Sequence, residues 1–258
     1  MQTGEVLRRE VFNLLDAAKG GRLKKLKEVN KHEIVEGVTE DYMERRVQTL
    51  LSYVKQHSPY YKEHPEWTKL EDFPVMTKGD FIEHYDEVLV DCVREQGNLY
   101  RLSTSGSTGT PFVCYQDEYK KRRVNAEIIY YSEKAGYQLG NNLSYIRTVV
   151  KQNQKSKLQQ FLQNQTLIQC GKLDDSGIEK MISQIARVSK KEPVTLLAYA
   201  STYTAIKDYA NRKNVDRIGN CNVKGIISGS EMLYDSTRDA MKKLFDAEVV
   251  SRYSNEEN

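Results

Sequence analysis

The order of apolar and polar residues predicts different structures in the two parts of the chain. In the first part, apolar residues recur at helical spacing over residues 5–18 and 39–57. Gly20 and Gly21 end the first run, and Pro59 ends the second. An extended segment over residues 73–78 and a short helix near residues 80–85 should follow. We therefore expect residues 1–98 to form a helical N-terminal region.

From residue 99 onward, short apolar runs alternate with helical segments. The strands that this pattern predicts are residues 99–102, 112–115, 145–150, 166–169, 194–199, 223–227 and 248–252. The predicted helices are residues 118–135, a segment that begins after Asp174–Ser176 and ends before Pro193, residues 202–211 and residues 235–245. This alternation favours parallel βαβ units, with the strands buried under helices on both faces. The sequence thus predicts an α/β fold with a mostly parallel sheet over residues 99–258.

The composition argues against two classes of function, nucleic-acid binding and cysteine-based metal or redox chemistry. The 258 residues include 39 basic and 36 acidic side chains, a net charge of +3, and 39% hydrophobic residues. This balance does not indicate nucleic-acid binding, which usually requires concentrated basic charge. The cysteines are far apart and form no CxxC pair, so they predict free thiols in place of a zinc cluster or a redox motif. They are Cys92, Cys114, Cys170 and Cys221.

The apolar segments are too short and too often interrupted for a membrane span or a signal peptide. No run approaches the roughly 20 apolar residues that a bilayer requires, and Arg8, Arg9 and Glu10 interrupt the N-terminal run. We therefore expect a cytoplasmic protein without an integral membrane segment. The basic residues between Arg22 and Lys27 are compatible with a solvated helix face or with peripheral membrane contact.

Residues 103–111 read STSGSTGTP and are the strongest candidate for a binding loop. Gly106 and Gly109 permit positive φ angles and close approach to a ligand, and the neighbouring hydroxyl groups suit the oxygens of a polyphosphate. The Lys-Ser/Thr ending of a Walker A loop is absent. A flexible Ser/Gly linker is the alternative. The position of the segment between two predicted strands favours the binding loop.

Residues 104–111 resemble the phosphate-binding loop of adenylate-forming enzymes, the acyl- and aryl-CoA ligase superfamily. The surrounding chain resembles the branch that contains phenylacetate–CoA ligase, coenzyme F390 synthetase and capsular-polysaccharide-associated proteins. Four further segments support the resemblance and occur in the family's order: residues 58–63, 73–78, 228–233 and 253–257.

The resemblance implies that ATP activates a small-molecule carboxylate as an acyl- or aryl-adenylate, which a thiol then takes up, most commonly that of coenzyme A. It also implies a role for particular residues. The residues implied to bind phosphate are Thr104, Ser105, Gly106, Ser107, Thr108 and Gly109, and those implied to bind adenine are Ser228, Gly229, Ser230, Glu231 and Tyr253. The residues implied at the edge of the acyl pocket are Tyr199 and Ser201. The implied Mg²⁺ ligand is Glu257, with Glu256 adjacent to it. Thr108 and Glu257 are the implied catalytic residues.

Simpler structural roles remain open for several of these residues. Glu231 is also placed to cap the helix that follows it, and Tyr253 to end a strand as an ordinary aromatic residue. Tyr199 and Ser201 are compatible with simple packing, and Glu256 with Glu257 is compatible with a solvated acidic end.

The chain also departs from the family's pattern. The family's ribose-binding Asp, its hinge and its small C-terminal domain with a catalytic Lys have no counterpart, and Tyr253-Ser254 replaces the usual Tyr-Gly. We therefore expect an N-terminal fragment of such an enzyme, truncated or completed by a second chain. The alternative is a nucleotide-binding or vestigial protein, without catalytic competence, associated with surface polysaccharide synthesis.

Overall fold

The computed structural model describes residues 3–91, 99–103, 112–148, 160 and 163–253. The chain divides into two compact units. One unit comprises Met1–Lys27 and Asn125–Asn255, and we call it the sheet unit. The other comprises Glu28–Val124 and Glu256–Asn258, and we call it the hairpin unit. Each unit is described by itself.

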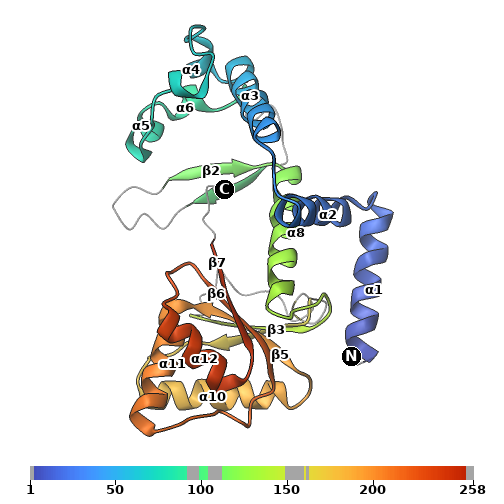
Figure 1. Cartoon of the computed structure of the whole chain (residues 1–258), viewed down its shortest axis with the longest axis vertical. Coiled ribbons are helices and arrows are strands. Elements are labelled where there is room, and N and C mark those ends of the chain that lie inside the picture. The colour runs from blue at the N-terminus through green and yellow to red at the C-terminus, as the bar shows by residue number, and fades with distance from the viewer. Residues whose placement is uncertain (1–2, 92–98, 104–111, 149–159, 161–162, 254–258) are drawn as a thin grey trace. The chain divides into compact units, whose positions relative to one another are not determined.

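A five-stranded parallel sheet forms the centre of the sheet unit (Figure 1). The strands lie in the order β4-β3-β5-β6-β7. Their bounds are β3 Asn142–Arg147, β4 Gln165–Gln169, β5 Val194–Tyr199, β6 Val223–Gly229 and β7 Glu248–Arg252. Helices α10 (Asp175–Ser189), α11 (Ala200–Lys213) and α12 (Asp235–Phe245) connect the later strands. The predicted α/β fold with parallel βαβ units is confirmed.

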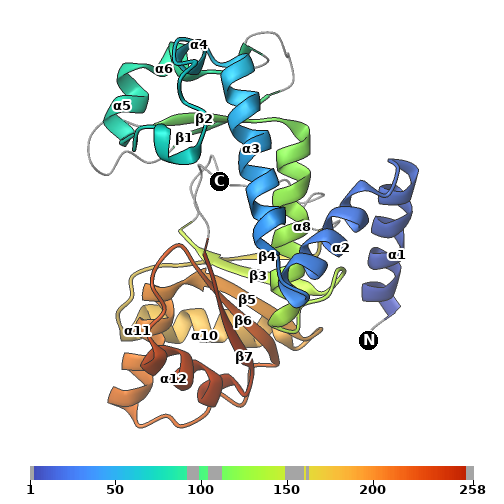
Figure 2. The ribbon, with the colours of Figure 1, turned by 45° about the horizontal axis from the view of Figure 1, so that its top comes forward.

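The larger core of the sheet unit lies between one face of the sheet and α10, α11 and α12 (Figures 1 and 2). The pattern that predicted α10 reflects this packing, because Ile178, Met181 and Ile185 are each at most 1% exposed. Strand residues Leu196 and Ile226 meet the helices from the sheet side. Burial on this scale makes the hydrophobic effect the main source of stability in the unit.

A smaller cluster lies on the opposite face of the sheet. Ala135, Leu197 and Ile227 form its buried centre. Ala135 follows α8 (Glu118–Lys134), so the C-terminal end of this helix packs here. Helices therefore lie against both faces, as expected, although three of them share one face.

Gly225 on β6 permits the close approach of α8 to the sheet. A Cβ atom at residue 225 would clash with the carbonyl oxygen of Ala135. Gly136 follows with φ of 79° and ends the helical segment. The end of α8 is thus held against β6 at a separation that only glycine allows.

Strand β3 begins three residues before the predicted start. Its first half carries Asn142 and Ser144, whose polar side chains interrupt the apolar pattern. Both are buried, and the Ser144 hydroxyl donates to Asn142 Oδ1 at 3.0 Å. Paired polar groups can occupy buried strand positions at little cost, which the apolar pattern does not reveal.

Helix α1 (Thr3–Ala18) matches the first predicted helix and is attached to the sheet unit through Arg8. The Arg8 guanidinium donates to the Gly140 carbonyl at 3.1 Å and pairs with Glu192 at 3.2 Å. Helix α2 (Arg22–Val35) was not predicted. It includes the basic cluster, and the Asp16 carboxylate accepts from the backbone N–H groups of Leu23 and Lys24 at its start.

The hairpin unit contains helices and one antiparallel strand pair. Its helices are α3 Glu40–His57, α4 Pro59–Lys62, α5 Lys78–Glu83 and α6 Tyr85–Val88, with the 3₁₀ helix η1 at Leu70–Asp72. Thr39 caps α3 by accepting from the Tyr42 N–H at 3.2 Å. Strands β1 (Tyr100–Ser103) and β2 (Val113–Gln116) pair antiparallel. The Ser/Thr/Gly segment thus connects the two strands of a hairpin.

Candidate functional site

The carboxyl ends of β5, β6 and β7 lie side by side at one edge of the sheet. Tyr199 pairs with Gly229, and Gly229 pairs with Arg252. In open α/β sheets, ligands bind outside this edge, because the chain reverses there into loops and helix N-termini. The fold therefore brings together three segments predicted from the sequence: Tyr199 with Ser201, residues 228–231, and Tyr253.

Ser228 can offer a ligand its backbone only. The residue is 0% exposed, and its side chain lies on the helix-covered face, two residues after the core residue Ile226. The Ser228 Oγ has no hydrogen-bond partner. This agrees with the expected backbone role, although the role itself stays a prediction.

Gly229 and Ser230 turn the chain away from the sheet. Ser230 is exposed and adopts φ of 67°, the left-handed region that non-glycine residues rarely occupy. At Gly229, an added Cβ atom would meet nothing within 4 Å in the described part of the chain. None of the described residues therefore covers the sheet edge directly above Gly229.

Glu231 interacts with the preceding crossover helix. Its Oε2 accepts a 2.7 Å hydrogen bond from the backbone N–H of Ser201, at the start of α11. A carboxylate at this position satisfies a free N–H group and complements the positive end of the helix dipole. The alternative that Glu231 caps the following helix is wrong, since α12 begins after Tyr234 without a side-chain cap.

Tyr199 and Tyr253 differ in their surroundings. Tyr199 is half-buried and occupies the N-cap position of α11. Tyr253 follows β7 and is 90% exposed. An aromatic side chain this exposed is available for stacking, and its contact with adenine stays a prediction.

Two arginines at this edge were missed by the sequence interpretation. Arg147 is the last residue of β3, and Arg252 is the last residue of β7. Burial lowers the pKa of Arg252 from its usual value. In the sequence, each arginine is marked only as a basic residue at the end of an apolar strand. Such a residue usually reaches solvent, so its position alone does not indicate a binding site.

The predicted phosphate loop, Thr104–Gly109 with catalytic Thr108, lies outside the described residues, as do Glu256 and Glu257. The described residues do show how the loop is anchored: Ser103 pairs with Val113 at the end of the hairpin. After the hairpin, the Asp117 carboxylate accepts from the Lys120 N–H at 2.6 Å, at the start of α8. The strand on each side of the segment is therefore as predicted.

No group of three or more His, Cys, Asp or Glu residues suited to a metal ion occurs within the described ranges. In the same ranges, no helix is both long and apolar enough to cross a membrane.

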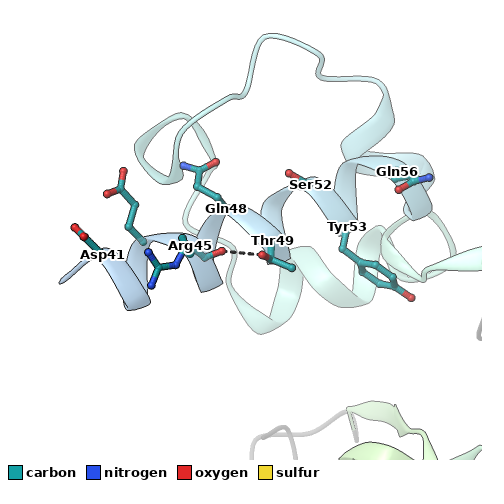
Figure 3. Close-up of a pocket in the computed structure, with 8 residues that line it drawn as sticks. Asp41, Arg45, Gln48, Thr49, Ser52, Tyr53 and Gln56 are labelled. Atoms are coloured by element: carbon teal, nitrogen blue, oxygen red, sulfur yellow. Dashed lines mark hydrogen bonds between the residues drawn. The ribbon is translucent and has the colours of Figure 1, made fainter. Parts of the chain in front are cut away.

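A depression of about 830 Å³ lies along α3 in the hairpin unit. Figure 3 shows that the residues lining it project from this one helix, and its drawn hydrogen bond joins the Thr49 hydroxyl to the Arg45 carbonyl at 2.7 Å. Binding sites usually combine polar groups that converge from several elements. We therefore regard this surface as an exposed helix face.

A parallel sheet with crossover helices and loops at its carboxyl edge defines an open α/β protein, a class in which ligands bind at that edge. Comparison with known proteins specifies the fold. None of the protein-family models compared with the sequence matches it. The chain is 25% identical to Protein CapK of Staphylococcus aureus over 230 residues, which are 83% of this chain and 49% of that protein.

Solved structures of 2-hydroxyisobutyryl-CoA ligase share the fold. An open conformation in complex with 2-HIB-AMP and CoA matches with a TM-score of 0.58 and 16% identity, over 84% of this chain and 53% of that chain. The thioesterification state matches with a TM-score of 0.57 over 85% and 50%. The chain thus spans about half the length of the relatives it matches. The resemblance to the adenylate-forming superfamily is confirmed at the level of the fold.

Proposed function

We propose that this chain contributes the ATP-binding part of an AMP-forming acid–thiol ligase. One observation supports this most directly: three segments far apart in the sequence, at Tyr199–Ser201, Ser228–Glu231 and Tyr253, meet at adjacent carboxyl ends of the sheet. These are the segments to which the family resemblance gives the acyl and adenine contacts. The matched structures of 2-hydroxyisobutyryl-CoA ligase hold 2-HIB-AMP.

In the proposed reaction, a carboxylate oxygen of the acid attacks the α-phosphorus of ATP. The bond to the bridging oxygen breaks, and pyrophosphate leaves with that electron pair. Such a reaction needs positioning and charge neutralisation more than a protein nucleophile. The chain's part would be to hold the phosphates at residues 104–109, to hold adenine against the backbone of residues 228–231, and to stack Tyr253 against it.

Mg²⁺ and coenzyme A belong to the proposal as well. Mg²⁺ favours a few carboxylate oxygens combined with phosphate oxygens, and Glu257 with Glu256 would supply the carboxylates. The ion would neutralise charge on the phosphates. Coenzyme A would accept the acyl group in a second step; one matched structure of 2-hydroxyisobutyryl-CoA ligase, in complex with 2-HIB-AMP and CoA, is in the thioesterification state.

Exchange of labelled pyrophosphate into ATP, in the presence of a panel of carboxylic acids, tests the first step. We expect acid-dependent exchange in the wild-type chain and its loss in Thr108→Ala and Gly109→Val. Ser183→Ala is the matched control, because the Ser183 hydroxyl only donates to the Glu179 carbonyl of its own helix. Acid-dependent exchange that persists in both loop variants would refute the phosphate-binding role of residues 104–109, and no exchange with any acid would refute adenylation by this chain.

A second candidate is nucleotide binding without catalysis. It requires only the nucleotide contacts proposed at the sheet edge, where the Ser228–Glu231 segment and the end of β7 lie side by side. Equilibrium binding of ATP decides between the two. Binding that Gly109→Val abolishes, together with no exchange for any acid, would support the binding role and exclude adenylation by this chain.

A further inference from the structure

Arg147 and Arg252 lie on the same face of the sheet. Side chains alternate along a strand, so Arg147 shares a face with Tyr145, and Arg252 shares a face with Val250. Tyr145 and Val250 both pack against the smaller cluster, on the face opposite the crossover helices. The two guanidinium groups therefore lie on the face that α10, α11 and α12 leave uncovered.

The register places both arginines in one row across the sheet. Tyr145 pairs with Leu197, so Arg147, two residues further along β3, lies level with Tyr199. Tyr199 pairs with Gly229, and Gly229 pairs with Arg252. The row thus reads Arg147, Tyr199, Gly229 and Arg252, with a cation at each end.

Among the described residues, no atom fills the space at Gly229, between the two cations. This residue is buried, yet an added Cβ atom would meet no atom of the described residues within 4 Å. Its φ angle lies outside the region that requires glycine. Backbone conformation therefore does not explain the missing side chain, whereas a ligand lying across the row would.

Neither guanidinium group has an anionic partner among the described residues. The Nε atoms of both arginines are buried and lack a hydrogen-bond partner. The Arg147 Cζ lies 5.0 Å from the centre of the Tyr145 ring, a cation–π contact that leaves its N–H groups available. Burial lowers the pKa of Arg252, because removal from water disfavours its charged form. An anionic ligand would pair with these partly buried charges and offset the cost of removing them from water.

We propose that Arg147 and Arg252 bind a second anionic group of the acid substrate, so that the chain selects acids with a carboxylate or phosphate at the end remote from the reacting carboxylate. This inference rests on the proposed function. The row includes Tyr199, the predicted acyl-pocket residue, and lies one residue before Ser230 and Tyr253, where adenine is expected. In the proposed function, residues 104–109 bind the phosphates of ATP. The arginine row is therefore assigned to the acyl end of the ligand.

Matched acids that differ by one group test this proposal. Succinate differs from butyrate, and glutarate from valerate, by a carboxylate in place of a terminal methyl group. Each acid is titrated into the wild-type chain in the presence of AMP, and affinity is measured by calorimetry. We expect the diacids to bind about 10- to 100-fold more tightly, since charge-assisted hydrogen bonds to arginine are strong. Phosphate-bearing 3-phosphopropionate distinguishes a preference for phosphate from one for carboxylate.

The variants Arg147→Met and Arg252→Met should each remove most of this preference while leaving the affinity for butyrate and AMP unchanged. Arg217→Met is the matched control, because Arg217 forms an exposed ion pair with Asp246 in the same unit. Circular dichroism establishes that the variants fold, and the wild-type preference for diacids tests the proposal without them.

Three outcomes would overturn the inference. If the wild-type chain binds diacids and monoacids equally, and monoacids still support pyrophosphate exchange, the inference is refuted but the proposed function is not. Weaker AMP binding in both arginine variants, with acid binding unchanged, would assign the row to the nucleotide. No binding or exchange with any acid would refute the proposed function together with the inference.

Discussion

The carboxylate of Glu231 accepts a 2.7 Å hydrogen bond from the backbone N–H of Ser201, and so joins the loop after β6 to the first turn of α11. Two neighbouring segments of the candidate site are held together by this contact. Both residues are exposed, so a ligand at the sheet edge would find them within reach. The contact gives Glu231 a structural role that can be separated from ligand binding by experiment.

Glu231→Ala should destabilise the sheet unit by about 0.5–2 kcal/mol, the usual effect of losing a helix N-terminal cap. This corresponds to a fall in melting temperature of roughly 2–4 °C per kcal/mol for a chain of this size. Glu231→Gln retains an oxygen acceptor and should lose less. Thermal unfolding is the measurement, with Met232→Ala as the control, since Met232 is 73% exposed. A variant as stable as the wild type, but unable to bind AMP, would show that Glu231 acts only on the ligand.

Gly225 and Gly229 lie on the same strand and should respond to alanine in opposite ways. Gly225→Ala places a Cβ atom against the carbonyl oxygen of Ala135, so we expect a loss of about 1–3 kcal/mol or failure to fold. The Cβ atom of Gly229→Ala meets no atom within 4 Å among the residues that the structure describes, so this variant should leave stability within about 0.5 kcal/mol. Urea unfolding of the two variants makes the comparison. Equal destabilisation would contradict the open space inferred above Gly229.

The attachment of α1 depends on Glu192. Its carboxylate pairs with Arg8 at 3.2 Å and also accepts from Asn142 Nδ2 at 3.4 Å. Both charged side chains are mostly buried, so we expect Glu192→Ala to cost about 1–3 kcal/mol. In Glu192→Ala, amide hydrogen exchange should become faster in α1 relative to the wild type, and α10 should be less affected. Lys243→Ala, which removes the exposed pair with Asp216, should change neither quantity. Unchanged protection of α1 in the Glu192 variant would show that the helix is held without the ion pair, for example by the Arg8–Gly140 hydrogen bond.

Cys221 predicts a loss of stability at alkaline pH. Burial raises the pKa of this free thiol to about 11, whereas an unfolded thiol ionises near about 8.5. The folded state therefore keeps a proton that the unfolded state releases. The contribution is fully present below about pH 8.5 and is lost as the pH rises through about 11. The stability difference between wild type and Cys221→Val should shift in favour of the variant between pH 8 and pH 10.5. A constant difference would mean that the thiol ionises equally in both states. Burial also raises the pKa of Tyr203. Because Tyr203 is present in both proteins, its contribution cancels in the stability difference between them.

The sequence pattern correctly predicted the helices and strands whose formation depends on nearby residues. Helix α10 and strands β5 and β6 follow from runs of Ile, Leu and Val with clear spacing, and the Asp174 cap was visible as well. The Asp174 carboxylate accepts from the Gly177 N–H at 2.9 Å. The pattern failed at α2, where lysines dominate and the capping carboxylate belongs to Asp16 of the preceding helix.

The site was only partly accessible to sequence interpretation. Motif resemblance identified residues 228–231 and Tyr253, because their order along the chain is informative. The arginine row depends on the register of four strands that join residues more than 100 positions apart. The local spacing of apolar residues does not predict how the strands pair. Only the folded sheet shows that Arg147 and Arg252 occupy one row.

The contact between Gly225 and Ala135 also limits how the sequence can diverge. The apolar residues around it, such as Ile226 and Ile227, can exchange with one another through compensating changes in volume. A Cβ atom at residue 225 cannot be accommodated in this way, because it would oppose a backbone oxygen present in every residue type. Among sequences as distant as 25% identity, a glycine at this point of β6, paired with a helix that ends opposite it, should be a more reliable mark of shared ancestry than the hydrophobic core itself.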